Sequence, residues 1–161
     1  MRIAIRQDML DGRDVEALVA DHRMFSEANA CRCADHALDM SSLRASDVTF
    51  WSAWEEATLL GFGALKQITV RHGEIKSMHT DRKHRGKGVG AALVSHILGE
   101  ARRRRYQRLS LETGASDGFA AARGLYARFG FTVCGPYHDY PDHPDSVFMT
   151  LDLTRPATRP S

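Results

Sequence analysis

The chain has 161 residues, of which 43% are hydrophobic and 26% charged, so it is long enough and apolar enough to bury a core. Its net charge of +2 at pH 7 does not indicate nucleic-acid binding. No stretch approaches the roughly 18 apolar residues of a membrane span, and the N-terminus has no signal-peptide core. We therefore expect a globular cytoplasmic protein that binds neither nucleic acid nor membrane.

The N-terminal part of the chain predicts one strand and two helices. Residues 2–6 alternate between apolar and polar side chains, as a short strand does. Residues 11–30 place apolar side chains at helical spacing and predict a helix. The chain that follows is less regular, and we expect a loop with a short helix around residues 35–44.

Three strands joined by short turns are expected next. They cover residues 48–54, 58–70 and 73–80, which predicts an antiparallel meander. Gly61 and Gly63 lie within the second strand, where a glycine indicates a bulge or a close approach of two backbones.

A basic, glycine-rich turn joins the third strand to a helix. The turn, Arg85-Gly86-Lys87-Gly88-Val89-Gly90, precedes apolar residues at helical spacing: Leu93, Val94, Ile97, Leu98 and Ala101. The first N–H groups of a helix have no intrahelical partner, and they carry partial positive charge. Because glycines let an anion approach these groups, and Arg85 and Lys87 add charge, the turn predicts a phosphate or pyrophosphate site.

A strand and another helix follow the helix that begins at the glycine-rich turn. Residues 108–113 predict the strand, and a helical connection implies that it runs parallel to the strand at 73–80. The next helix is expected over 118–129, with Ser116 or Asp117 as its cap and a glycine directly after its end.

The chain ends with a pair of strands and a tail. The strands are expected over 131–134 and 146–153, on either side of a loop rich in His, Asp and Pro. Nothing in the sequence resembles a linker or an internal repeat, so we expect one domain over residues 1–153. Residues 154–161 contain two prolines and predict a flexible C-terminal tail.

With these elements in place, two motifs resemble those of the GNAT superfamily of acetyl-CoA-dependent N-acetyltransferases, in particular its small stand-alone bacterial members. The signature Q/R-x-x-G-x-G/A is met by Arg85-Gly86-Lys87-Gly88-Val89-Gly90. A second block, Leu-Tyr followed by Gly-Phe, is met by Leu125-Tyr126-Ala127-Arg128-Phe129-Gly130-Phe131. The resemblance implies an α/β (α+β) GNAT fold: a mixed, mostly antiparallel twisted sheet of about six to seven strands flanked by about four helices.

The resemblance also implies where acetyl-CoA binds. Backbone groups of Met78, His79 and Thr80 would hold the pantetheine arm, and the N–H groups of the turn would hold the pyrophosphate. The turn residues in this set are Arg85, Gly86, Lys87, Gly88, Val89, Gly90 and Ala91. Phe119, Arg123 and Tyr126 complete the implied cofactor contacts, with Phe119 standing where the family often has Asn.

Acetyl transfer to an amine also needs a group that takes up the ammonium proton. Glu74 lies eleven residues before Arg85, the offset at which several family members place a catalytic glutamate. Glu112, at the end of the next strand, is the other candidate. Strand alternation would place Glu74, Lys76 and Met78 on one face, so a surface pairing of Glu74 with Lys76 is the alternative role.

Tyr126 resembles the family's general acid. A phenol with a pKa of about 10 is a weaker acid than a thiol with a pKa of about 8.5, so full proton transfer would be uphill by roughly 2 kcal/mol. We therefore expect a hydrogen bond from Tyr126 to the leaving thiolate. The alternative role is that of a core tyrosine on an amphipathic helix.

Three other features of the sequence also have structural explanations. Cys31, Cys33 and His36 fit no standard zinc spacing, so no metal is expected. Arg102–Arg105 falls in the last turn of a helix, where cations complement the helix dipole. The acids of loop 135–145 would favour a cationic amine near the acceptor, and a solvated turn explains them equally well.

Two other functions fit parts of the pattern. Gly86-x-Gly88-x-x-Ala91, followed by Glu112, satisfies the dinucleotide pattern of an NAD(P)-dependent oxidoreductase, although five residues, four of them charged, separate the strand from the first glycine. A catalytically inactive CoA-binding module is the second alternative. We expect an enzyme that moves an acetyl group directly, through a ternary complex, to a primary amine of a small-molecule or peptide acceptor. A homodimer is compatible with this function.

Overall fold

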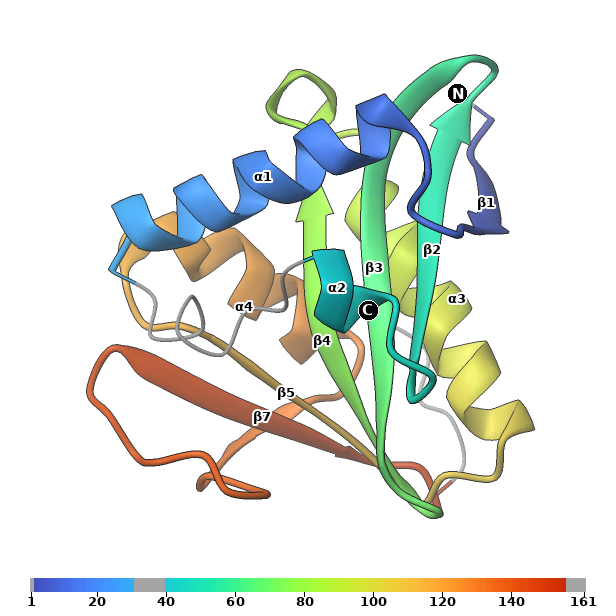
Figure 1. Ribbon diagram of the computed structural model, residues 1–161. Coiled ribbons are helices and arrows are strands. Elements are labelled where there is room, and N and C mark those ends of the chain that lie inside the picture. The colour runs from blue at the N-terminus through green and yellow to red at the C-terminus, as the bar shows by residue number, and fades with distance from the viewer. Residues whose placement is uncertain (1, 31–39, 156–161) are drawn as a thin grey trace.

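The computed structural model describes residues 2–30 and 40–155, which form a twisted sheet with helices on both faces (Figure 1). The strands are β1 (Ala4–Gln7), β2 (Val48–Glu55), β3 (Thr58–Thr69), β4 (His72–Thr80), β5 (Arg108–Gly114), β6 (Thr132–Cys134) and β7 (Ser146–Asp152). The helices are α1 (Arg13–Ala28), α2 (Met40–Leu43), α3 (Val89–Arg103) and α4 (Ala120–Arg128), with 3-10 turns at Arg82–His84 and Asp117–Phe119.

The seven strands are ordered β1-β2-β3-β4-β5-β7-β6 across the sheet. β1 to β4 form an antiparallel meander, and β4 and β5 are the one parallel pair among the described strands. The predicted α/β class, the order of elements and the parallel pair are confirmed. The short helix expected around 35–44 appears at Met40–Leu43, and the rest of that range, with Cys31, Cys33 and His36, lies outside the described residues.

Two hydrophobic clusters build the layers on the two faces of the sheet. α1 and α2 pack against one face, where Phe50 and Phe62 belong to their cluster. α3 and α4 pack against the opposite face with Leu65, Ile75 and Leu109. Figure 1 shows α1 crossing in front of the sheet and α3 behind it. None of the described helices is long and apolar enough to cross a lipid bilayer.

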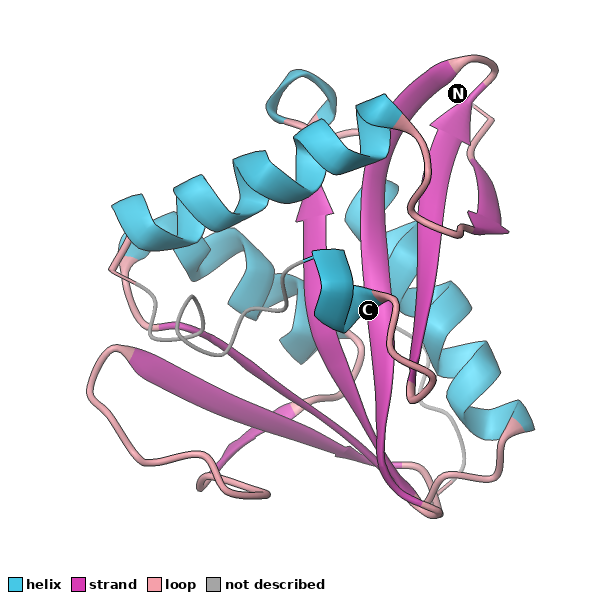
Figure 2. Ribbon diagram, viewed as in Figure 1, coloured by secondary structure: helices cyan, strands magenta, loops and turns pink. Residues whose placement is uncertain are grey.

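β4 and β5 are paired only at one end. Their ladder runs from the pair His72–Arg108 to the pair Ile75–Leu111. Beyond it β4 stays bonded to β3, and β5 stays bonded to β7, so the two halves of the sheet separate (Figure 2). The later residues of both strands therefore face each other without pairing.

A β-bulge in β4 changes the faces that alternation predicts. Ile75 and Ser77 pair with consecutive residues of β3, so Lys76 is the extra residue between them. Glu74 consequently lies on the face of β4 opposite to Met78. The prediction that Glu74, Lys76 and Met78 share one face was wrong, because alternation fails across a bulge.

The start of α4 also differs from its prediction. Neither Ser116 nor Asp117 caps the helix with its side chain, and the Ser116 hydroxyl instead donates to the carbonyl oxygen of Asn29 at 2.8 Å. A 3-10 turn over Asp117–Phe119 leads into the helix, which begins at Ala120. The competing hydrogen bond to α1's C-terminal side explains the missing cap.

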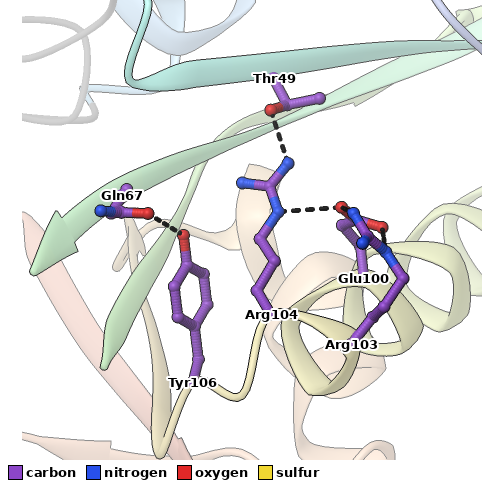
Figure 3. A network of polar contacts seen from close by, with 6 residues as sticks. All are labelled: Thr49, Gln67, Glu100, Arg103, Arg104 and Tyr106. Carbon is purple, nitrogen blue, oxygen red and sulfur yellow. Dashed lines mark hydrogen bonds and ion pairs between the residues drawn. The ribbon is translucent and has the colours of Figure 1, made fainter. Parts of the chain in front are cut away.

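The arginines at the end of α3 contact neighbouring elements. Arg104 donates to Glu100 at 2.8 Å and to Thr49 of β2 at 2.8 Å, and Arg103 also bonds to Glu100 (Figure 3). The hydrogen bond from Arg103, together with Arg104, lowers the pKa of Glu100 to about 2. These contacts give Arg103 and Arg104 a structural role, as the helix-end position suggested.

The glycines of β3 lie at close approaches, as predicted. A Cβ at Gly61 would lie 2.6 Å from the carbonyl oxygen of His79, and one at Gly63 would lie 3.0 Å from Ile97 Cδ1. Gly61 therefore allows β3, β4 and α3 to pack at their observed spacing.

Replacing Gly61 should weaken the fold. Gly61→Ala is expected to lower the free energy of unfolding by about 1–3 kcal/mol, because the added carbon forces the backbone apart. Gly99→Ala is the matched control, since Gly99 lies in α3 with open space around a built Cβ. We expect this control to raise the free energy of unfolding by about 0.5–1 kcal/mol. Urea denaturation measures both, and wild-type stability in Gly61→Ala would contradict the close approach.

Candidate active site

A cavity of about 390 Å³ opens where β4 and β5 diverge. Residues 75–80 of β4 line one side, and Glu112 and Thr113 of β5 line the other. The start of α3, the helix α4 and the C-terminal half of α1 complete the wall. Such a concave site with a few polar groups among apolar ones is typical of small-molecule binding.

The glycine-rich turn closes one end of this cavity. Gly86 and Gly88 have φ values of +77° and +84°, which favour glycine, and a Cβ at either would meet nothing within 4 Å. The N–H groups of Val89, Gly90 and Ala91 belong to the first turn of α3, so they have no intrahelical acceptor. This open backbone has the unpaired N–H groups that the predicted phosphate or pyrophosphate site requires.

Most residues implied to contact the cofactor line the cavity: Met78, His79, Thr80, Arg85, Gly86, Gly88, Val89, Gly90, Ala91, Phe119 and Tyr126. Lys87 and Arg123 are not among its lining residues. Lys87 Nζ lies 3.4 Å from Nδ1 of His84. The Arg123 guanidinium donates to the carbonyl oxygens of Gly114 at 2.6 Å and Ser116 at 2.9 Å.

Tyr126 lies on α4 with its ring against Phe131, the two centroids 5.8 Å apart. No described residue accepts or donates a hydrogen bond at its hydroxyl, and the residue lines the cavity. Burial raises the pKa of Tyr126 above its ordinary value. Its phenol is therefore a proton-bearing donor at neutral pH.

Glu74 is only 2% exposed and is not among the residues that line the cavity. The Tyr137 hydroxyl donates to its Oε2 at 2.6 Å, and the Tyr140 hydroxyl donates to its Oε1 at 3.1 Å. Lys76 Nζ lies 3.7 Å from Oε1. The pairing of Glu74 with Lys76 is thus present. It is buried, whereas a surface position was expected from the sequence.

Glu112 does line the cavity, from the β5 side. Its Oε2 accepts a hydrogen bond from the Ser146 hydroxyl at 2.9 Å. The structure therefore places the two candidate bases differently: Glu112 at the cavity wall, and Glu74 behind it.

Sequence reasoning missed the contribution of α1 to this wall. His22, Phe25 and Ser26 line the cavity, and Nδ1 of His22 lies 3.1 Å from Nδ1 of His79. Burial, with a smaller effect of His79, lowers the pKa of His22 to about 3, and burial with Arg85 lowers that of His79 to about 4. Both imidazoles are therefore neutral at pH 7.

The Ser26 hydroxyl is buried and has no hydrogen-bond partner among the described residues. His22 and Ser26 sit on the side of α1 that faces the sheet. Polar residues on an otherwise apolar helical stripe were the available signal for this wall. No local pattern, however, indicated that α1 lies over β4.

The family described as "Acetyltransferase (GNAT) family" matches residues 15–131 of the chain. This chain belongs to the GNAT acetyltransferase family. The matched range contains both sequence motifs and every residue that lines the cavity.

This GNAT chain is also similar to three individual proteins. It is 48% identical to "Uncharacterized N-acetyltransferase YsnE" of Bacillus subtilis (strain 168) over 149 residues, which cover 92% of this chain and 99% of that protein. A crystal structure from Klebsiella pneumoniae subsp. pneumoniae, whose name assigns it to the acyl-CoA N-acyltransferases, is 28% identical with a TM-score of 0.80. The match covers 94% of this chain and 97% of that one.

The third is a GNAT acetyltransferase of Elizabethkingia anophelis, solved with acetyl-CoA bound. It has a TM-score of 0.70 at 18% identity, covering 94% of this chain and 98% of that one, so it supports the fold alone. Family membership confirms the predicted GNAT fold and the class of acetyl-CoA-dependent N-acetyltransferases. The dinucleotide alternative is not favoured, because an antiparallel meander leads into the turn.

Among the described residues, no group of three or more His, Cys, Asp or Glu side chains is placed to hold a metal ion.

The histidine pair should make stability fall on acidification. His22 titrates near 6.5 in the unfolded chain and at about 3 in the fold, so below pH 6.5 the unfolded state binds more protons. Between pH 7 and pH 5 this should lower the free energy of unfolding by about 1–2 kcal/mol. His22→Asn should remove that part of the pH dependence. Urea denaturation at both pH values tests this, and parallel losses in variant and wild type would contradict it.

Proposed function

We propose that the protein binds acetyl-CoA in the cavity between β4 and β5 and transfers the acetyl group directly to a primary amine. Acetyl-CoA, when bound, supplies an acetyl group activated as a thioester. One observation carries this proposal. The open glycine turn, the free edge of β4 and Tyr126 all line the same cavity.

The donor site follows from the position of each group. The N–H groups of Val89, Gly90 and Ala91, with the charge of Arg85, would hold the diphosphate. Backbone groups at residues 78–80, which have no partner strand on the side of β5, would hold the pantetheine arm. Phe119 would supply an apolar contact where an amide is common in the family.

Tyr126 would donate a hydrogen bond toward the leaving sulfur. Burial raises its pKa further above that of a thiol, so complete proton transfer from the phenol is unfavourable. A positioned donor still stabilises the charge that develops during the reaction. We therefore assign Tyr126 a stabilising role.

The amine would enter from the side of α1 and of Glu112. Glu74 and Glu112 are the two candidates for the group that finally receives its proton, and we favour Glu74 for its enclosed position between two phenols and an ammonium group. A small-molecule or peptide amine both fit this proposal, and its setting would be the cytoplasm, either as a monomer or as a homodimer.

Acetyl-CoA and CoA should stabilise the protein, and NAD should not. A ligand at about 100 times its Kd adds roughly 2.7 kcal/mol to the free energy of unfolding, which raises Tm by about 5–11 °C in a chain of this size. Arg85→Gln should reduce the shift, whereas Lys87→Gln should retain it, because only Arg85 lines the cavity. Thermal-shift titration measures these differences. A larger shift with NAD than with CoA would contradict the proposal.

Tyr126→Phe should lower kcat by roughly 10- to 100-fold while the KM for acetyl-CoA changes little, because the lost hydrogen bond acts in the transition state. Tyr106→Phe is the control, since Tyr106 is also buried but donates to Gln67 outside the cavity. Steady-state and single-turnover rates provide the test. A wild-type rate in Tyr126→Phe would remove the residue from the chemical step.

A further inference from the structure

Glu74, Lys76, Tyr137 and Tyr140 form a polar cluster beside the cavity. Lys76 lines the cavity, whereas Glu74 does not and is 2% exposed. The two tyrosines come from the loop between β6 and β7 and cover the carboxylate. A proton that passes from the cavity to Glu74 must therefore cross another group.

Two hydrogen bonds connect Lys76 to Glu74 through Tyr140, and both donate toward the carboxylate. Lys76 Nζ donates to the Tyr140 oxygen at 2.6 Å, and the Tyr140 hydroxyl donates to Glu74 Oε1 at 3.1 Å. The direct distance from Lys76 Nζ to Glu74 Oε1, 3.7 Å, is too long for a hydrogen bond. The hydrogen-bonded path from Lys76 to the carboxylate thus passes through Tyr140.

We infer that the proton released by the acceptor amine reaches Glu74 through Lys76 and Tyr140. This relay rests on the proposed function. The Tyr140 proton moves to the Glu74 carboxylate, and a proton of the Lys76 ammonium replaces it on Tyr140. The neutral Lys76 amine then takes a proton from the acceptor's ammonium group. In sum, one proton moves from acceptor to Glu74, and Lys76 and Tyr140 end unchanged.

The charges around the path are compatible with these steps. Burial lowers the pKa of Lys76, against the raising effect of Glu74 and Glu112, while Lys66 of β3 lowers it further. A transiently neutral Lys76 is therefore less costly here than in water. Burial and Glu74 raise the pKa of Tyr140, so its resting form is the phenol that a relay needs.

Tyr137 provides a matched comparison. It lies in the same loop, its ring centroid is 5.4 Å from that of Tyr140, and both rings pack near Phe148. Its hydroxyl bonds to Glu74 Oε2 at 2.6 Å, but no hydrogen bond in the described structure joins it to Lys76. Both tyrosines hydrogen-bond to Glu74, and of the two only Tyr140 also bonds to Lys76, which lines the cavity.

The relay predicts unequal effects of two phenol-to-phenyl substitutions. Tyr140→Phe should lower kcat by roughly 100-fold without changing affinity for acetyl-CoA, because proton removal contributes on this scale. Tyr137→Phe should cost about threefold or less, as expected for one positioning hydrogen bond. The loss in Tyr140→Phe should shrink as the pH approaches the acceptor's pKa, because a free amine needs no relay.

Rates are measured with acetyl-CoA and the best acceptor among tyramine, spermidine, L-lysine and an alanine-terminal peptide, with thermal unfolding as the control for folding. Lys76→Met combined with Tyr140→Phe should be no slower than either single variant, since the two residues act as a unit. Equal losses in Tyr137→Phe and Tyr140→Phe, or a loss in Tyr140→Phe that is independent of pH, would overturn the relay while leaving the acetyltransferase assignment intact.

An NMR titration, which needs no catalytic turnover, tests the relay separately from the proposed function. In protein with 13C-labelled lysine, the NMR signal of Lys76 is identified by its absence in Lys76→Met. Its titration should shift in Tyr140→Phe and stay in place in Tyr137→Phe. An unshifted Lys76 titration in Tyr140→Phe would overturn the relay. Acetyl-CoA that neither binds nor reacts in the wild type would contradict the proposed function, whatever the titration shows.

Discussion

The short pairing of β4 with β5 is the constraint on which the site depends. The two strands share a ladder only from His72–Arg108 to Ile75–Leu111 and then part. Each half of the sheet keeps its own hydrogen bonds, because β4 remains on β3 and β5 remains on β7. The fold thereby exposes strand backbone inside a cavity, away from the outer edges of the sheet at β1 and β6, and that backbone is available to an extended ligand.

Buried polar side chains surround this opening together with the apolar ones. Glu74 and Lys76 are both buried, and burial of an ion pair is costly unless hydrogen bonds compensate for the lost water. Tyr137 and Tyr140 supply such bonds from a loop that is distant in sequence. On the other wall, Ser26 keeps a buried hydroxyl without a partner among the described residues.

Local patterns were sufficient to predict most elements and one end of the site. The glycines of residues 85–90 and the apolar spacing of α3 depend on neighbours in sequence, and they predicted the turn and the helix where the structure has them. The bulge at Lys76 could not be predicted, because it depends on which β3 residues pair with β4. The Tyr137–Glu74 contact joins residues 63 positions apart, and the His22–His79 contact joins residues 57 apart. Only the assembled sheet brings these pairs together.

Hydrogen exchange tests most directly whether the parted strands hold the donor. Amide exchange is measured in the full chain with and without CoA, and followed by residue. The account predicts slower exchange at the amides of residues 78–80 and 86–91 when CoA is bound, with little change in the paired segment 72–75. Slower exchange elsewhere, with those two segments unchanged, would contradict it.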